Sequence, residues 1–188
     1  HSSASSRAVL AAQSPLTRFA TGLLQLSSTY VIYGVASIPF VVFFLFARGW
    51  LFGSIPTEQL VAVTLGLTVF TWPLFMTIAI ASKWILIGRY REGSFPLWGW
   101  YHLRVWLVGR LAALSGAGAL VGTPLLPIYL RLMGARIGRH CTLDSAMIGA
   151  WDLIEIGDDT SIGADTQLLG YRVENGLLHF GGVRIGSH

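Results

Sequence analysis

The chain has 188 residues, of which 53% are hydrophobic and 12% charged, with a formal net charge of +4. Soluble domains carry about 25% charged residues, so this composition excludes an ordinary water-soluble globule. The high hydrophobicity also excludes a disordered chain. The charge is divided unevenly, because residues 1–143 carry +9 and residues 144–188 carry −5. A basic, apolar first part and an acidic second part indicate two kinds of structure.

Two uncharged runs predict a pair of membrane-spanning helices. Twenty-nine residues without a formal charge lie between Arg18 and Arg48, and twenty-four more lie between Glu58 and Lys83. A bilayer core of about 30 Å is spanned by about 20 apolar residues of helix, so both runs are long enough. The alternative is two buried core helices of a large soluble protein. The twelve-residue connection 47–58 joins the two runs into a helical hairpin.

The positive charges predict the orientation of this hairpin. Its connection holds Arg48 against Glu58, whereas the flanking segments contain Arg7, Arg18, Lys83, Arg89, Arg91, Arg104 and Arg110. The positive-inside rule places such flanks in the cytoplasm. We therefore expect a multi-pass protein of the plasma membrane, with the lipid bilayer as a partner. Both ends of the chain and its C-terminal domain are then cytoplasmic.

Aromatic and basic side chains are interleaved directly after the hairpin, over residues 89–110. Such residues are typical of the lipid headgroup region, so an interfacial segment is the preferred interpretation. A nucleic-acid surface is the alternative, and the adjacent membrane span argues against it, so we expect no nucleic-acid partner. The predicted membrane-interface residues are Arg89, Arg91, Trp98, Trp100, Tyr101, Arg104, Trp106 and Arg110.

Residues 111–130 form a third uncharged run. The run contains three glycines and two prolines, which makes it a poor straight helix. It is either a broken or re-entrant segment or a helix that lies along the membrane and leads to the next domain. We favour the second of these interpretations.

A six-residue repeat begins at Ile137. An Ile–Gly pair recurs at Ile137, Ile148, Ile156, Ile162 and Ile185. This recurrence is the hexapeptide signature of a parallel β-helix, and chance is the alternative. The aliphatic side chain points inward, and we expect the glycine to relieve a corner with positive φ. Because the pattern stops partway at the last residues, we expect a piece of a longer protein.

Two segments interrupt the repeat. Residues 150–153 are inserted between repeats, and we expect them to bulge one corner. Residues 169–182 predict a hairpin excursion, because Asn175–Gly176 is a strong signal for a type I′ turn. Such excursions often form lids or subunit contacts.

The segments around this repeat resemble known families. The stretch 129–138 (YLRLMGARIG) and the stretch 152–158 (DLIEIGD) resemble the left-handed β-helix acyltransferases of the hexapeptide family. More narrowly, the region from residue 83 resembles the membrane-bound C-terminal region of poly-ε-lysine synthetase and related enzymes of the nonribosomal-peptide-synthetase type. The residues that carry this likeness are 83–89 (KWILIGR), 95–98 (FPLW) and the Arg104–Trp106 pair. Trp151 stands where such proteins often have proline before the Asp–Leu pair.

The resemblance completes the expected fold class. We expect a membrane protein with a transmembrane α-helical hairpin and interfacial helices, followed by the first coils of a left-handed parallel β-helix with a hairpin excursion. The expected divisions are a polar N-terminal segment (1–22), the transmembrane hairpin (23–88), an interfacial segment with a connecting helix (89–133) and the truncated start of the β-helix domain (134–188).

The resemblance also implies an activity for the full-length protein. An adenylation domain activates an amino acid, and a carrier domain of the same protein holds it as a phosphopantetheine thioester. An amine attacks that thioester, so the reaction is acyl transfer with amide bond formation, by an assembly expected to be a homo-oligomer. The segment itself is expected to bind no cofactor, and whether it is an enzyme alone stays open. One alternative is a membrane-tethered acyltransferase that uses acetyl-CoA on a sugar or lipid, and another is a non-catalytic anchor or scaffold.

Acyl transfer to an amine needs a base and donors for the oxyanion. Because hexapeptide acyltransferases use a histidine at a coil edge, the resemblance makes His140 and His179 the candidate catalytic residues. A surface or turn histidine is the alternative for each. His102 lies in the interfacial segment and is expected to be structural.

Two other clusters are assigned no chemistry. Cys141 follows His140, but adjacent strand residues point to opposite faces, so the two cannot easily form a nucleophile–base pair. Asp158, Asp159 and Asp165 occupy polar repeat positions that are typical of a solvated corner, so we predict no metal site.

Overall fold

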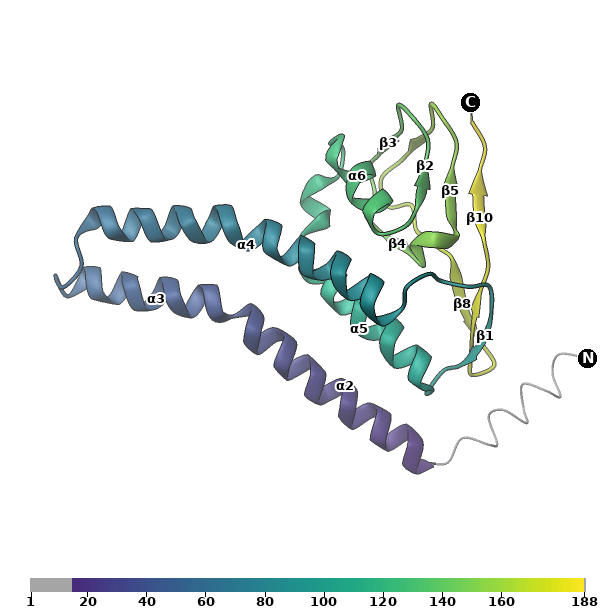
Figure 1. Ribbon diagram of the computed structural model, residues 1–188, viewed down its shortest axis with the longest axis horizontal. Coiled ribbons are helices and arrows are strands. Elements are labelled where there is room, and N and C mark those ends of the chain that lie inside the picture. Colours follow the sequence, from purple (N-terminus) through teal and green to yellow (C-terminus); the bar gives the residue numbers. More distant parts are fainter. Residues whose placement is uncertain (1–14, 188) are drawn as a thin grey trace, which may run out of the picture.

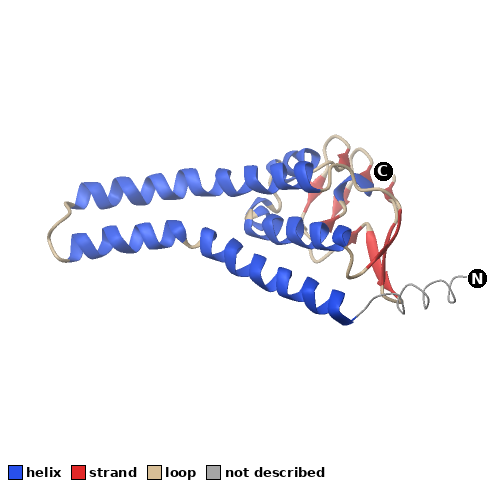
Figure 2. Cartoon of the chain, turned by 60° about the horizontal axis from the view of Figure 1, so that its bottom comes forward, coloured by secondary structure: helices blue, strands red, loops and turns tan. Residues whose placement is uncertain are grey.

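The computed structural model describes residues 15–187; the first part of the predicted polar segment, with Arg7, lies outside the described residues. The helices are α2 (Pro15–Ala36), α3 (Ile38–Leu51), α4 (Thr57–Leu86), α5 (Trp100–Leu114) and α6 (Leu125–Leu132), with the short 3-10 helices η1 (Ala117–Leu120) and η2 (Trp151–Leu153). The strands gather at one end of the molecule, and α3 projects with the first half of α4 from the other (Figures 1 and 2).

Helices α2 and α3 are nearly continuous and bend at Ser37 (Figure 1). Pro39 lies in the first turn of α3, where its missing N–H is tolerated, but in a continuous helix it would remove a hydrogen bond to α2 and its ring would clash with the preceding turn. The chain then turns over residues 52–56 into α4. This connection is shorter than the predicted segment 47–58, because α3 continues as far as Leu51.

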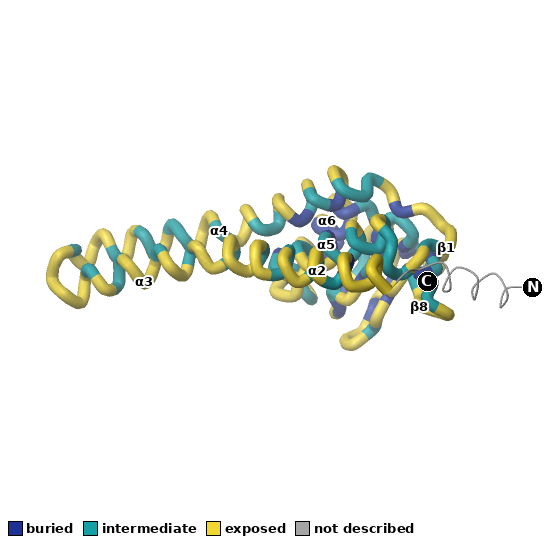
Figure 3. The backbone as a smooth tube through the Cα atoms, turned by 90° about the horizontal axis from the view of Figure 1, so that it is seen from below, coloured by how far each residue is buried: buried dark blue, intermediate teal, exposed yellow. Residues whose placement is uncertain are grey.

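Two helical segments, Pro15–Leu51 and Thr57–Leu86, are long and apolar enough to cross a membrane. Core helices of a soluble protein would be mostly buried. Here α3 has no buried residue, and α4 buries only Ala79 and Lys83, near its end beside the strands (Figure 3). Apolar side chains that stay exposed on all sides are costly in water and stable in lipid. We call the projecting pair of α3 and α4 the helical arm.

Short parallel strands make three small sheets. Strands β2 (Arg136–Ile137), β5 (Ile154–Ile156) and β10 (Val183–Ile185) form one sheet in the order β10-β5-β2. The other two sheets pair β3 (Thr142–Leu143) with β6 (Ser161–Ile162), and β4 (Ile148–Gly149) with β7 (Leu168–Leu169).

The register of these sheets stacks the repeat positions. The aligned pairs are Ile137 with Ile156, Leu143 with Ile162, and Ile148 with Leu168, and all six side chains are buried. Successive turns of the chain therefore bury their aliphatic residues in one common core, as the repeat predicts.

The expected role of the repeat glycines was wrong. Positive φ angles occur instead at His140, Ala150, Asp159 and Asp165. Gly138 and Gly157 lie where the next turn passes: a Cβ on Gly157 would come within 2.4 Å of the Ser187 nitrogen, and one on Gly138 would collide with Asp158. Glycine is needed here because stacked turns approach closely, not because of a left-handed backbone.

A fourth, antiparallel sheet has the order β1-β9-β8 and contains β1 (Gly93–Pro96), β8 (Tyr171–Glu174) and β9 (Leu177–Phe180). The predicted hairpin is confirmed, since β8 and β9 pair and both Asn175 (φ 50°) and Gly176 (φ 71°) have the positive angles of a type I′ turn. Its third strand, β1, comes from the middle of the predicted interfacial segment.

The helices after β1 cover the parallel strands. Residues 111–130 are broken into the end of α5, η1 and the start of α6, as the first of the two interpretations of this run requires. Helix α6 buries Leu126, Tyr129 and Leu130 in the shared core. Its opposite side exposes Leu125, Ile128 and Leu132.

Candidate functional site

One buried ion pair joins the helical arm to the strands. The Lys83 ammonium, at the end of α4, lies 2.9 and 3.0 Å from the two carboxylate oxygens of Asp152. The same carboxylate accepts the Tyr90 backbone N–H at 3.0 Å, and the Lys83 Nζ lies 3.5 Å from the centre of the Trp84 ring. Lys83 is fully buried. Asp152 therefore compensates a charge that would otherwise be unpaired in the interior.

The inserted segment 150–153 positions Asp152 for this contact. Ala150 has a φ of 51°, η2 follows it, and the ring of Trp151 is buried beneath the insertion. A Cβ on Gly134, whose φ is 108°, would collide with the Asp152 carboxylate and the Lys83 ammonium. The expected bulge therefore places the Asp152 carboxylate next to the end of α4.

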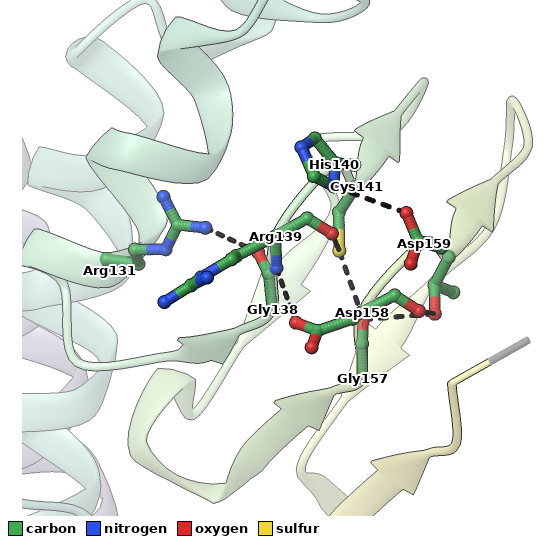
Figure 4. Close-up of polar contacts among 9 residues, drawn as sticks. Arg131, Gly138, Arg139, His140, Cys141, Gly157, Asp158 and Asp159 are labelled. Carbon is green, nitrogen blue, oxygen red and sulfur yellow. Dashed lines mark hydrogen bonds and ion pairs between the residues drawn. The ribbon is translucent and has the colours of Figure 1, made fainter.

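The first predicted histidine, His140, lies on an exposed corner between β2 and β3 (Figure 4). Its Nδ1 is 3.3 Å from a carboxylate oxygen of Asp159, and the two side chains are 81% and 62% exposed. The two residues have the same left-handed backbone in successive turns of the chain. His140 is therefore a solvent-exposed turn residue whose contact with Asp159 is also exposed.

The neighbours of His140 are used to hold this corner together. The Cys141 thiol points away from the imidazole and donates to the Gly157 carbonyl oxygen at 3.1 Å (Figure 4). The Arg139 backbone N–H donates to the Asp158 carboxylate at 2.6 Å. Arg131 donates from α6 to the carbonyls of Ile137 and Gly138. These contacts fix the turn, and they hold the Cys141 thiol on the Gly157 carbonyl oxygen and not on the His140 imidazole.

The second predicted histidine, His179, lies in the middle of a polar row across the antiparallel sheet. The register places Arg172 of β8 and Ser94 of β1 on either side of it. The Ser94 hydroxyl oxygen is 2.7 Å from His179 Nδ1. When the Nδ1–H donates to this oxygen, Nε2 carries the lone pair of the neutral ring and can accept a proton.

An aromatic cluster supports the other face of this sheet. The Phe180 ring contacts the rings of Tyr90, Phe95, Tyr101 and Tyr171, with centroids 5.6–5.9 Å apart. Successive strand residues point to opposite faces, so a rigid Phe180 sets the direction of His179. The polar row of Ser94, His179 and Arg172 is therefore backed by packed aromatic rings on the opposite face of the sheet.

A surface cavity of about 440 Å³ opens beside this polar row. It is lined by Ser94, Arg172 and His179 and by the glycines of the β1 and β9–β10 segments. The Glu92 carboxylate accepts the N–H of Gly182, one of the lining glycines, at 3.1 Å. A hydroxyl, an imidazole and a guanidinium thus meet at a cavity wide enough for a small reacting group.

The structure does not bring the two histidines together. The β2–β3 corner and the β1–β8 region lie at opposite ends of the strand region (Figure 1). In the described chain, His140 is paired with Asp159 and His179 with Ser94. They belong to separate sites.

The predicted interface residues are distributed over several elements. On α5, the Arg104 guanidinium lies over the Trp100 ring at 5.4 Å, and the Arg110 guanidinium over the Trp106 ring at 5.3 Å. Tyr101 instead stacks on Phe95 at 4.2 Å in the aromatic cluster. Trp98 lies directly before α5, where its ring contacts His102, and Arg89 and Arg91 lie in the connection from α4 to β1.

Burial shifts the titration of several groups outside the two helical segments that are long enough to cross a membrane. It raises the pKa of the Tyr90 and Tyr129 phenols, and the hydrogen bond between Tyr129 and Ser115 opposes the shift at Tyr129. Burial also lowers the pKa of His102. Its Nδ1 is the one buried side-chain nitrogen or oxygen without a hydrogen-bond partner within residues 15–187. The phenols stay protonated donors, and His102 favours its neutral form.

Sequence reasoning missed two residues of these sites. Ser94 lies between a glycine and an aromatic residue in the interfacial segment, and no local motif marks it. Its pairing with His179 spans 85 residues. Asp152 carried a usable signal, because an isolated acid in an apolar insertion demands a partner, and Lys83 is the cation at the end of the preceding span.

Comparison with known proteins gives one informative similarity. The chain is 34% identical over 135 residues to the Delta-poly-L-ornithine synthetase of Acinetobacter baumannii (strain AB307-0294). The matched region covers 68% of this chain and 10% of that protein, so the chain spans about a tenth of the length of the curated relative it matches. No family model matches the sequence. No solved structure matches it. The similarity supports a relationship between this chain and the poly-amino-acid synthetases.

Proposed function

We propose that this chain is part of a membrane-embedded poly-amino-acid synthetase that joins amino acids through acyl transfer to an amine. The observation that carries the proposal is the 34% identity to a Delta-poly-L-ornithine synthetase over two thirds of the chain. The acyl donor is an aminoacyl thioester on the phosphopantetheine of a carrier domain, which an adenylation domain of the same protein loads.

The strands are the opening turns of a left-handed β-helix of the hexapeptide type. Two features support this interpretation. Strands pair in parallel with strands about three hexapeptides further along the chain, and the aliphatic residue of each repeat is buried. Further turns on the open edge of β10 would extend the same core and complete the domain in a homo-oligomeric assembly.

His179 is the base of the reaction. The amine nitrogen attacks the thioester carbonyl carbon, the C–N bond forms, and the C–S bond breaks as the carrier thiol leaves. His179 Nε2 takes the proton of the attacking amine, while Ser94 holds Nδ1 at 2.7 Å. Arg172, next to His179 in the sheet, is the cation nearest to the tetrahedral oxyanion along this row, and its guanidinium must turn from the exposed Glu174 carboxylate, 3.4 Å away, to stabilise it. His140 has an acidic partner, Asp159, but it does not line the cavity beside Ser94 and Arg172, which makes it the second choice.

The helical arm anchors this chemistry to the plasma membrane. The exposed apolar surface of α3 and α4 supports insertion into lipid. The basic residues that flank the arm support a cytoplasmic position for the strands, where a carrier domain can reach them. The buried Lys83–Asp152 pair then holds the site at a set distance from the bilayer.

The test uses the full-length protein in lipid nanodiscs with a loaded carrier domain, and it measures amide product. We expect His179→Ala to lower the rate about a hundredfold, because general base catalysis contributes that much. Ser94→Ala should lower the rate less, since the imidazole stays in place. His140→Ala is the matched control, as it removes an exposed histidine from the other end of the strands.

Each other outcome has a definite meaning. An unchanged rate in both histidine variants would show that neither is the base and would favour a scaffold role. Product formed from acetyl-CoA on a sugar or lipid, without a carrier, would replace the proposal with a coenzyme A-dependent acyltransferase.

A further inference from the structure

A second cavity, of about 390 Å³, lies between the helical cover and the strands. Helices α5, η1 and α6 form one side, and residues 146–151 and 167–171 form the other. Ligand sites in proteins usually have volumes of about 300–1,000 Å³, so this space is large enough for a small molecule or a single extended chain. The proposed reaction at His179 does not use it.

The lining of this cavity carries no formal charge. Its polar side chains are the phenols of Tyr90, Tyr129 and Tyr171 and the amide of Gln167. The Tyr129 hydroxyl is already 3.1 Å from the Ser115 hydroxyl. An ion would find no opposite charge in this lining and would lose part of its hydration, so the lining disfavours an ionic ligand. A ligand that fits is uncharged, mainly apolar and has few hydrogen-bonding groups.

Two glycines of the lining are required neither by the backbone nor by packing. Gly109 lies inside α5 and Gly118 inside η1; neither has a positive φ, and a Cβ on either would meet nothing within 4 Å. At Gly134 and Gly157, by contrast, a Cβ would collide with neighbours. Glycine inside a helix is destabilising relative to alanine, so Gly109 has a local cost with no structural return. At this position a larger side chain would extend into the cavity, which Gly109 lines.

We infer that this cavity binds an uncharged, extended, mainly aliphatic chain. Two sources supply an uncharged, extended chain: the acyl tail of a membrane lipid, which is aliphatic throughout, and the pantetheine arm of the carrier, whose two amides would need the phenols and the Gln167 amide of the lining as hydrogen-bond partners. The second source rests on the proposed function. Leu169 and Tyr171 line both this cavity and the one beside His179, so the two cavities adjoin. The lipid source needs only the membrane position of the arm.

Photolabelling of the full-length protein in phosphatidylcholine nanodiscs tests the inference. One probe is a phosphatidylcholine with a diazirine in its acyl tail, and the other is pantetheine with a diazirine. After irradiation, digestion and mass spectrometry map the label. We expect label on residues 105–118 or 146–151, reduced by an excess of the same probe without diazirine. Label on α3 and α4 from the lipid probe is the internal standard.

Filling the cavity should abolish this label. We expect Gly109→Leu and Gly118→Leu each to lower the cavity label about tenfold, as overpacking a site removes binding free energy. Gly66→Leu is the matched control, because Gly66 also lies in a helix with nothing within 4 Å of a Cβ, yet does not line the cavity. Thermal unfolding shows which variants are folded. If Gly109→Leu does not fold, the label measured on Gly118→Leu tests the inference.

The outcomes separate the two sources and the two proposals. Label from the lipid probe alone assigns the cavity to a membrane lipid, and label from pantetheine alone assigns it to the carrier arm. Absence of cavity label from both probes, with α3 and α4 labelled, overturns the inference. Equal label in folded leucine variants and wild type also overturns it. If the rate measurements show that His179 is not the base, the result from the lipid probe still stands, because it does not depend on the proposed reaction.

Discussion

The helical arm and the strand region are built on opposite principles. In the arm, each helix makes its backbone hydrogen bonds within itself, and α3 has no buried residue. In the strand region, strands of two to four residues are stable only because chain segments far apart in sequence pack together. The arm therefore depends on its surroundings, and the strand region depends on its own contacts. The two meet at the Lys83–Asp152 pair, which is where a single substitution should have the largest effect.

Lys83→Met removes one partner of that pair and leaves the Asp152 carboxylate short of its countercharge. We expect a loss of about 3–5 kcal/mol in the free energy of unfolding of the strand region. Thermal or denaturant unfolding in detergent, followed by near-UV circular dichroism, measures it. The double variant Lys83→Met/Asp152→Leu should recover part of the loss, because no unpaired charge remains. A single variant as stable as wild type would contradict a structural role for the pair.

Phe44→Arg tests whether the arm is surrounded by lipid. Phe44 is exposed in the middle part of α3, and an arginine there makes membrane insertion about 3 kcal/mol less favourable. Insertion is measured by glycosylation mapping in microsomes. Leu51→Arg, at the end of α3, is the matched control, since its side chain reaches the interface. Equal insertion of both variants would indicate that α3 does not cross the membrane.

Gly157→Ala tests the stacking of turns in the strand region. The added methyl would meet the backbone of residues 186–187, and we expect a loss of about 1–3 kcal/mol in the free energy of unfolding. Gly163→Ala is the control, because a Cβ at Gly163 meets nothing within 4 Å. If the two variants unfold at the same temperature, the turns are not stacked as described.

His102 should give the smallest effect, visible only in its pH dependence. Burial lowers the pKa of folded His102 below its ordinary value of 6.5. As the pH falls through that value, the unfolded chain binds a proton that folded His102 resists, so stability is lost towards lower pH. His102→Phe should reduce the drop in Tm between about pH 7.5 and about pH 5.5. An identical drop in wild type and in His102→Phe would refute the assignment.

Several features of the strand region were predictable because they depend on local patterns. The Ile–Gly repeat predicts which side chains are buried, and Asn175–Gly176 predicts the β8–β9 hairpin, since only certain residues adopt its turn angles. The reason for the repeat glycines was not predictable. A collision such as that between Gly157 and Ser187 involves a part of the chain that sequence periodicity does not place.

The candidate site divides in the same way. His179 was a candidate from the sequence because the resemblance to hexapeptide acyltransferases directs attention to histidines of the repeat and its hairpin. Its partner Ser94 was not, because nothing near Ser94 indicates that residues 93–96 form the third strand of that hairpin's sheet. The cavity between the helices and the strands was not predictable either, because its walls come from helices and strands that are far apart in the sequence.

By itself, the sequence determined the apolar helices of the arm, the basic flanks, the repeat and its hairpin. Each of these depends on side chains close together in the chain, on helical hydrogen bonds or on the angles of a single turn. Only the tertiary structure decided the pairing of Lys83 with Asp152, 69 residues away, and of Ser94 with His179, 85 residues away. Contacts over such separations arise when the whole core packs, and local preferences do not specify them.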